Sequence, residues 1–165
     1  EKVPERGMMT VFNRSHYEDV LIARVRELVP KAVWSKRYDQ INEFEELLTE
    51  SGTIILKFFL HISKNEQKER LMKREVDPIK AWKLSAGDWE ERQYWSGYQR
   101  AYEIALSKCS MENAPWYVIP ADHKWYRDLA VAQQIVDALE PHKQTWVSSL
   151  EALGKLQLAE IAAIR

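Results

Sequence analysis

Residues 53–67 read TIILKFFLHISKNEQ, where a nearly unbroken apolar run passes directly into a helix start signal. The run over 53–62 is short and rich in β-branched and aromatic residues, which is typical of a strand buried on both faces of a parallel sheet. Ser63 and Glu66 have capping-box spacing and predict a charged helix to about Glu75, which Asp77-Pro78 ends. A strand that leads straight into a helix is typical of an α/β protein.

The same strand signal occurs at residues 8–13 and 116–121. Amphipathic patterns predict helices between and after the three strands, at 17–29, 34–50, 88–110 and 122–139. Asp122 is expected to cap the last of these helices and Pro141 to end it. Strands that alternate with helices predict a parallel sheet with ligands at the carboxyl ends of its strands. Three strands make a thin sheet, so the chain is expected to lack some strands of the complete sheet.

Composition narrows the class of protein. The chain has 165 residues, 45% apolar and 30% charged, which suits one compact domain. Its net charge of −1 argues against nucleic acid as a partner, and no apolar run approaches the roughly 20 residues of a membrane span. The single Cys109 excludes an internal disulfide and a cysteine zinc site. We therefore expect a cytoplasmic protein with local anion sites.

A polar cluster follows the first predicted strand, where residues 13–19 read NRSHYED. A guanidinium such as that of Arg14 forks onto phosphate oxygens, and the carboxylates of Glu18 and Asp19 can hold a hard divalent cation. The alternative is that Asn13, Ser15 and Asp19 cap the next helix while Arg14 points into water. Capping explains one or two polar residues but not six, so the cluster favours a phosphate and metal site.

Two further regions carry local positive charge. Asp122, Lys124 and Arg127 follow the last predicted strand at the start of a helix, where backbone donors and the helix dipole favour anions. A nucleotide could bind there, or the residues could be a capped helix with surface cations. Residues 64–83 contain seven Lys or Arg against four Asp or Glu. That excess suits either a solvated face or a cationic flap that closes over phosphates.

Several common catalytic motifs are absent from the sequence. The five glycines, at 7, 52, 87, 97 and 154, form neither a G-x-x-x-x-G-K-[ST] phosphate loop nor a G-x-G-x-x-G turn. The four histidines are scattered singly, which argues against a histidine metal site, and no G-x-S-x-G elbow surrounds Ser15.

The longest motifs of the chain resemble those of the polyphosphate kinase 2 family. The similarity is carried by VFNRSHYEDVL at 11–21, LKFFLHIS at 56–63, Asp77-Pro78, IPAD at 119–122 and Lys124-Trp125. It covers about residues 3–140. The resemblance implies a three-layer α/β fold of the P-loop-kinase or thymidylate-kinase type, with a parallel sheet and a helical lid. It also implies transfer of a terminal phosphate between inorganic polyphosphate and a nucleotide.

By this resemblance, Asn13, Arg14, Glu18 and Asp19 form the catalytic strand end. Asn13 stands where many members have Asp, so Glu18 and Asp19 are the expected ligands of Mg²⁺ or Mn²⁺. The NRSHYED variant is similar to the subgroup that accepts nucleoside mono- and diphosphates, which implies AMP and ADP, or guanine nucleotides. The expected polyphosphate contacts are Lys68, Arg70, Arg74, Lys80 and Lys83, and the expected nucleotide contacts are Asp122, Lys124 and Arg127.

The chain departs from the family in one respect. Members carry a Gly-x-Asp-x-x-Gly-Lys-Gly loop on an earlier strand, and no such loop occurs in these 165 residues. We therefore expect a partial domain over 1–140 that lacks the N-terminal strand and phosphate loop, with a lid at about 64–87 and an amphipathic helical extension over 141–165. The parent enzyme is expected to be a homo-oligomer, a dimer or tetramer, and this chain alone is expected to be inactive. The alternative is an inert polyanion-binding or assembly module.

Overall fold

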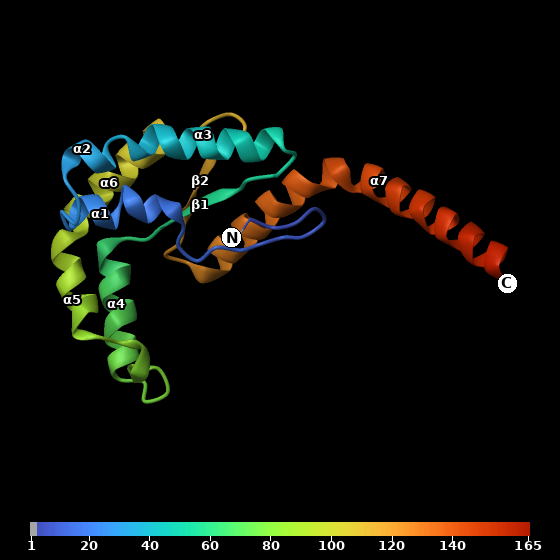
Figure 1. Ribbon diagram of the computed structural model, residues 1–165. Helices are drawn as coiled ribbons and strands as arrows, with labels where there is room; N and C mark the ends of the chain where they lie inside the picture. The colour runs from blue at the N-terminus through green and yellow to red at the C-terminus, as the bar shows by residue number, and fades with distance from the viewer. Residues whose placement is uncertain (1–2) are drawn as a thin grey trace. The chain divides into compact units, whose positions relative to one another are not determined.

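The computed structural model describes residues 3–165 and divides into two compact units, the first ending at Val118 and the second running from Ile119 to Arg165. Each unit is described by itself. Figure 1 shows the order of their elements. The first unit contains short helices, the lid and most of the sheet, whereas a single long helix makes up most of the second.

The sheet has two strands, β1 (Lys57–His61) and β2 (Trp116–Pro120), which lie side by side and parallel. Both were predicted, although β1 is shorter than the apolar run that contains it. The predicted strand at 8–13 was wrong, because these residues belong to no strand in the described part of the chain. Extended backbone becomes a strand only when a neighbour accepts and donates its hydrogen bonds. An apolar run therefore indicates a segment that favours β structure, but it does not indicate whether a neighbouring strand is present to pair with it.

Four helices follow residue 15: η1 (His16–Asp19), α1 (Ile22–Val25), α2 (Lys31–Trp34) and α3 (Arg37–Glu50). The continuous helix predicted over 17–29 was therefore wrong. Glu27 adopts a left-handed φ of 51°, and the Leu28 amide donates to the carbonyl of Ala23, which ends the helix as a Schellman motif does. Gly52, with φ 85°, ends α3 in the same way, as its sequence position indicated.

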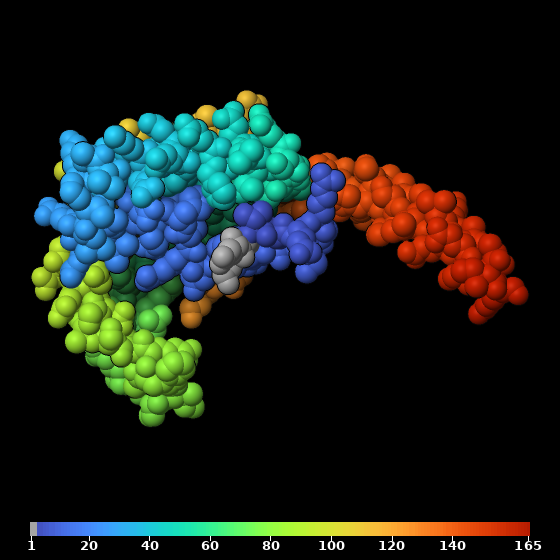
Figure 2. All heavy atoms as spheres, viewed as in Figure 1, coloured from blue at the N-terminus to red at the C-terminus, as the bar shows by residue number. Residues whose placement is uncertain are grey.

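The predicted cap at Ser63 is confirmed, because the Glu66 amide donates to Ser63 Oγ at 3.1 Å. The helix that it begins, α4, spans Lys64–Glu75. The helix predicted over 88–110 is divided into α5 (Ala86–Glu91), η3 (Arg92–Tyr94) and α6 (Trp95–Lys108). A short helix, η2 (Ala81–Lys83), lies between α4 and α5. Helices α4 and α5 run side by side (Figure 1), and the segment from α4 to α5 projects from the first unit in Figure 2.

The core of the first unit lies between η1, α3 and α6. Its buried members are Tyr17, Val20, Leu21, Tyr38, Ile41, Ala101, Ala105 and Cys109. The aromatic stripe predicted on α6 packs only in part. Tyr102 stacks on Phe59 of β1 with ring centroids 4.3 Å apart, while the fully buried positions of α6 are the small residues Ala101 and Ala105. The core therefore fixes the segment that directly follows Arg14.

The second unit is dominated by α7 (Lys124–Ile164), a helix of 41 residues with none of its side chains buried. Two sequence expectations fail here, because His123 rather than Asp122 is the N-cap and Pro141 lies inside the helix. Proline removes one hydrogen bond and bends a helix, but an exposed helix can continue past it because water satisfies the released carbonyl. Figure 1 shows such a bend along α7.

Candidate functional site

The Arg14 turn, defined here as residues 13–19, joins extended chain to helix η1. Ser15 is the N-cap of η1: its Oγ accepts from the Tyr17 amide at 3.4 Å, and its carbonyl accepts from the Glu18 amide at 3.1 Å. The capping alternative thus holds for Ser15 alone. Arg14 has a φ of 70°, a left-handed conformation that costs a non-glycine residue about 1–2 kcal/mol. Strain of this kind is concentrated at functional sites.

The charged side chains of the Arg14 turn face solvent. Arg14 Nε lies 3.8 Å from Glu18 Oε1, and the Arg14 side chain is 75% exposed. Asp19 Oδ2 lies 3.8 Å from Arg37 Nε on α3. Pairs of this length at the surface contribute at most about 1 kcal/mol, so an incoming phosphate can displace the carboxylate from Arg14. Asn13 is also exposed.

Carboxylates near Arg14 suit a cation held mainly by its substrate. In the described part of the chain no three His, Cys, Asp or Glu side chains come together as a ready-made metal site. Magnesium usually takes only one or two carboxylates and completes its shell with water and substrate phosphates. Glu18 and Asp19 are adjacent on η1 and only weakly paired with arginines, which fits this mode of binding.

The five predicted lid cations differ in their surroundings. Arg70 Nε donates to Glu66 Oε1 at 2.7 Å, and Lys80 Nζ donates to Asp77 Oδ2 at 2.5 Å. The hydrogen bond from Lys80 holds the pKa of Asp77 below its ordinary value. Lys68 and Lys83 are exposed, and Arg74 is half-buried. The structure therefore places all five on one projecting segment, with two of them paired to neighbouring carboxylates.

Contacts that the sequence did not reveal hold the lid together. Arg92 Nη1 donates to Gln67 Oε1 at 2.6 Å and to the Lys64 carbonyl at 3.1 Å. Trp89 Nε1 donates to Glu75 Oε1 at 2.7 Å. These bonds join α5 and η3 to α4 across a gap of fourteen residues or more. The pairing of distant residues carries no local sequence signal.

The third predicted group lies in the second unit, at the start of α7. Lys124 is exposed, and Arg127 Nη2 forms a 2.6 Å ion pair with Asp128 Oδ1. Asp122 precedes the N-cap residue instead of serving as the cap. Trp125 is also exposed beside Lys124. The first turn of α7 thus presents cations and an aromatic face, a combination that can bind a phosphate or stack on a base.

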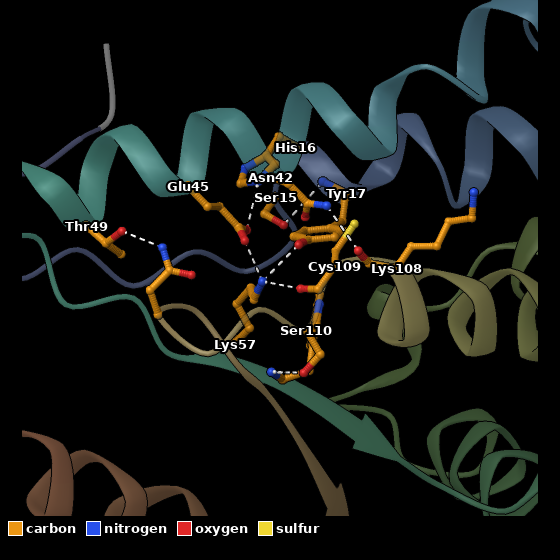
Figure 3. Close-up of polar contacts among 12 residues, drawn as sticks. Ser15, His16, Tyr17, Asn42, Glu45, Thr49, Lys57, Lys108, Cys109 and Ser110 are labelled. Carbon is orange, nitrogen blue, oxygen red and sulfur yellow. Dashed lines mark hydrogen bonds and ion pairs between the residues drawn. The ribbon is translucent and has the colours of Figure 1, made fainter.

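Beneath the Arg14 turn lies a buried ion pair, shown in Figure 3. Lys57, the first residue of β1, is 7% exposed, and Glu45 of α3 is 2% exposed. Lys57 Nζ donates to Glu45 Oε2 at 2.5 Å, to Tyr17 Oη at 3.0 Å and to the Cys109 carbonyl at 2.6 Å. His16 Nε2 lies 3.4 Å from Glu45 Oε1. The one sequence signal of this pair is a lone lysine inside an apolar run, which indicates a buried lysine but not its partner.

The protonation states of the pair follow from its surroundings. Burial raises the pKa of Glu45, but hydrogen bonds from His16 and Lys57 outweigh burial and bring the pKa below 4.5. Burial lowers the pKa of Lys57, and the Glu45 carboxylate opposes this shift. Burial, with the negative charge of Glu45, also raises the pKa of Tyr17 far above 10. At neutral pH Glu45 is a carboxylate and Tyr17 a neutral hydroxyl.

Comparison with known proteins places this geometry in a family. A family model described as polyphosphate kinase 2 matches residues 1–146. The chain belongs to the polyphosphate kinase 2 family. It is 55% identical over 140 residues to the AMP/ADP-polyphosphate phosphotransferase of Meiothermus ruber, a match that covers 85% of this chain and 52% of the relative. It is also 47% identical over 165 residues to the ADP-polyphosphate phosphotransferase of Rhodopseudomonas palustris, covering 93% and 57%.

A solved structure of the family supports the same assignment. Polyphosphate kinase 2 from Arthrobacter aurescens TC1 matches with a TM-score of 0.82 and 53% identity, over 84% of this chain and 49% of that one. The family and the α/β, P-loop-kinase-like fold class that the sequence predicted are both confirmed. The chain spans about half the length of these relatives. In the described residues no helix is long and apolar enough to span a bilayer.

Proposed function

We propose that this chain contributes the acceptor and lid side of a polyphosphate-dependent nucleotide phosphotransferase, which moves a terminal phosphate reversibly from inorganic polyphosphate to AMP or ADP. The observation that carries the proposal is the 55% identity with a protein named AMP/ADP-polyphosphate phosphotransferase over 85% of this chain. The exposed Arg14 and the cationic lid supply the charge that such a reaction requires.

In this proposal the protein acts by position and charge. Phosphoryl transfer needs little covalent participation from protein side chains, because catalysis comes from alignment and from neutralising charge on the phosphoryl oxygens. Arg14 contacts a phosphate from the fixed side, and Lys68, Arg70, Arg74, Lys80 and Lys83 approach from the lid. Asp122, Lys124 and Arg127 contact the nucleotide.

A divalent cation, Mg²⁺ or Mn²⁺, is part of the proposal. When bound, it would offset the negative charge of the phosphate groups. Glu18 and Asp19 are its proposed protein ligands. Their ion pairs with Arg14 and Arg37 are long, at 3.8 Å, and therefore weak enough for the carboxylates to bind the cation instead.

A second candidate function rests on the sequence itself. The 165 residues contain no glycine-rich phosphate loop, and α7 carries exposed apolar side chains, among them Trp146, Leu150 and Leu153. An inert module that binds polyanions and associates with further copies through α7 would have these features. The prediction that the chain alone does not turn over is common to both candidates.

A phosphotransfer assay separates the two functions. The chain is incubated with polyphosphate, Mg²⁺ and either AMP or ADP, and the product is followed by chromatography. A reaction with ATP in place of polyphosphate tests donor choice. Formation of ADP or ATP from polyphosphate would defeat the inert-module function. Saturable binding of polyphosphate without product is expected of both functions, and absence of both product and binding would contradict both for this chain.

A further inference from the structure

The ammonium of Lys57 joins four elements at one buried point. Its three donors are all used, by Glu45 of α3, Tyr17 of η1 and the Cys109 carbonyl that follows α6, while Lys57 itself begins β1. A lysine ammonium has three donors and no acceptor, so its hydrogen-bonding capacity is fully satisfied. The group is therefore held in one geometry.

This buried point is connected directly to the Arg14 turn. Tyr17 and His16 follow Arg14 by three and two residues, and both contact the pair: Tyr17 Oη accepts from Lys57, and His16 Nε2 meets Glu45 Oε1 at 3.4 Å. Figure 3 shows these side chains converging from η1, α3 and β1. Ser15, between Arg14 and His16, is fixed as the cap of η1. Every residue from Ser15 to Tyr17 thus has a defined partner.

Stability alone does not explain the presence of two charges here. Replacing a buried ion pair by apolar side chains of similar volume is often neutral or stabilising, because desolvation offsets the attraction between the charges. Arg14, however, adopts a φ of 70°. A residue keeps such a strained backbone conformation only where contacts of the surrounding residues hold it there. Core packing of the Tyr17 ring supplies part of that constraint, and the directional bonds to His16 and Tyr17 add to it.

We propose that Lys57 and Glu45 are positioning residues, which hold Tyr17 and His16 so that the Arg14 turn keeps its left-handed backbone and presents the guanidinium to phosphate. This inference rests on the proposed role of Arg14 as a phosphate contact. Neither Lys57 nor Glu45 touches phosphate, since both are buried.

The test uses the Glu45→Met/Lys57→Met double variant of the full chain. Two apolar side chains of similar length fill the space of the pair and avoid a lone buried charge, so this variant should be more stable than Lys57→Met alone. Tripolyphosphate with Mg²⁺ is the probe, titrated calorimetrically, and amide NMR reports the backbone of Arg14 and Ser15. We expect shifted Arg14 and Ser15 resonances and an affinity about ten-fold below wild type, the scale of one charge-assisted hydrogen bond.

A purely structural pair predicts a different result. In that case affinity and the Arg14 and Ser15 resonances return to wild-type values as stability returns, and this outcome would overturn the inference. Tyr17→Phe provides a milder second variant if the double variant does not fold. It removes only the hydroxyl that Lys57 contacts and keeps the ring in the core. Unchanged resonances and affinity in Tyr17→Phe would also overturn the inference.

Arg14→Ala keeps the two proposals apart. If Arg14→Ala loses affinity but the double variant does not, the positioning inference fails and the role of Arg14 stands. If Arg14→Ala binds tripolyphosphate as wild type does, Arg14 is not a phosphate contact. The positioning inference, which rests on that contact, is then also wrong.

Discussion

The Arg14 turn and the predicted lid are both proposed to present cations to phosphate, but the structure supports the two regions in opposite ways. Arg14 stands on a turn whose next three residues are capped or bonded to buried groups. The lid cations stand on α4 and on the segment at η2 that follows it. Arg70 and Lys80 pair with half-buried carboxylates of the same segment. Phosphoryl transfer needs both a fixed reference point and a part that can close. We therefore propose the first role for the turn and the second for the lid.

The largest expected effect comes from breaking the buried pair on one side. Lys57→Met leaves Glu45 buried without its ammonium partner, and such a change typically lowers the free energy of unfolding by about 3–5 kcal/mol. Urea denaturation measures it. Lys80→Met in the lid is the matched control, since it removes the same charge from a pair whose lysine is 59% exposed. Equal losses in the two variants would erase the contrast between the regions.

Acid should destabilise the protein through Glu45. Its folded pKa lies below 4.5, so the unfolded chain takes up the proton first and unfolding becomes easier as the pH falls below 4.5. The stabilisation is present above that pH and is lost as the pH passes the folded pKa. Thermal denaturation between pH 6 and pH 3 should show this loss, and Glu45→Gln should flatten it. A Glu45→Gln profile parallel to that of wild type would contradict the assignment.

On the lid side, Ser63→Ala should cost about 1 kcal/mol, because it removes the side-chain acceptor for the Glu66 amide at the start of α4. The loss should be local. Hydrogen exchange should accelerate in the first turn of α4 while the amides of Ile41 and Ala105 in the core stay protected. Ser51→Ala, which removes a hydroxyl bonded to the Leu47 carbonyl at the end of α3, is the control that leaves α4 exchange unchanged.

The smallest expected effect is an increase in the stability of the folded protein. Arg14→Gly should raise the free energy of unfolding by roughly 0.5–1 kcal/mol, because glycine adopts positive φ without the steric cost that arginine bears. The same variant should lose phosphate affinity because the guanidinium is gone. Urea denaturation and a tripolyphosphate titration, run together, measure both changes. A destabilised Arg14→Gly protein would show that the turn is not strained.

Local patterns predicted the elements that local forces determine. The Ser63 cap and the end of α3 at Gly52 each depend on residues within one or two turns of sequence. The apolar runs located β1 and β2, but each strand forms because the other supplies its hydrogen-bond neighbour. The strand predicted at 8–13 was wrong because a strand needs a hydrogen-bonding neighbour. The helix end predicted at Pro141 was wrong because an exposed helix can continue past a proline when water satisfies the released carbonyl. The polar composition of the Arg14 turn predicted its position, but it did not predict the buried ion pair that contacts the turn. Glu45 and Lys57 come from different elements, and nothing in either segment indicates that they meet.

Calorimetric titration of tripolyphosphate with Mg²⁺ into wild type, Arg14→Ala and Arg6→Ala measures directly whether Arg14 is a specific phosphate contact. Arg6 is an exposed arginine of the same unit, so its removal changes the net charge equally. We predict saturable binding by wild type and Arg6→Ala, and an affinity about ten-fold lower for Arg14→Ala. Equal affinities for the two variants would mean that the turn only adds to the overall charge, which contradicts its role as the fixed phosphate contact.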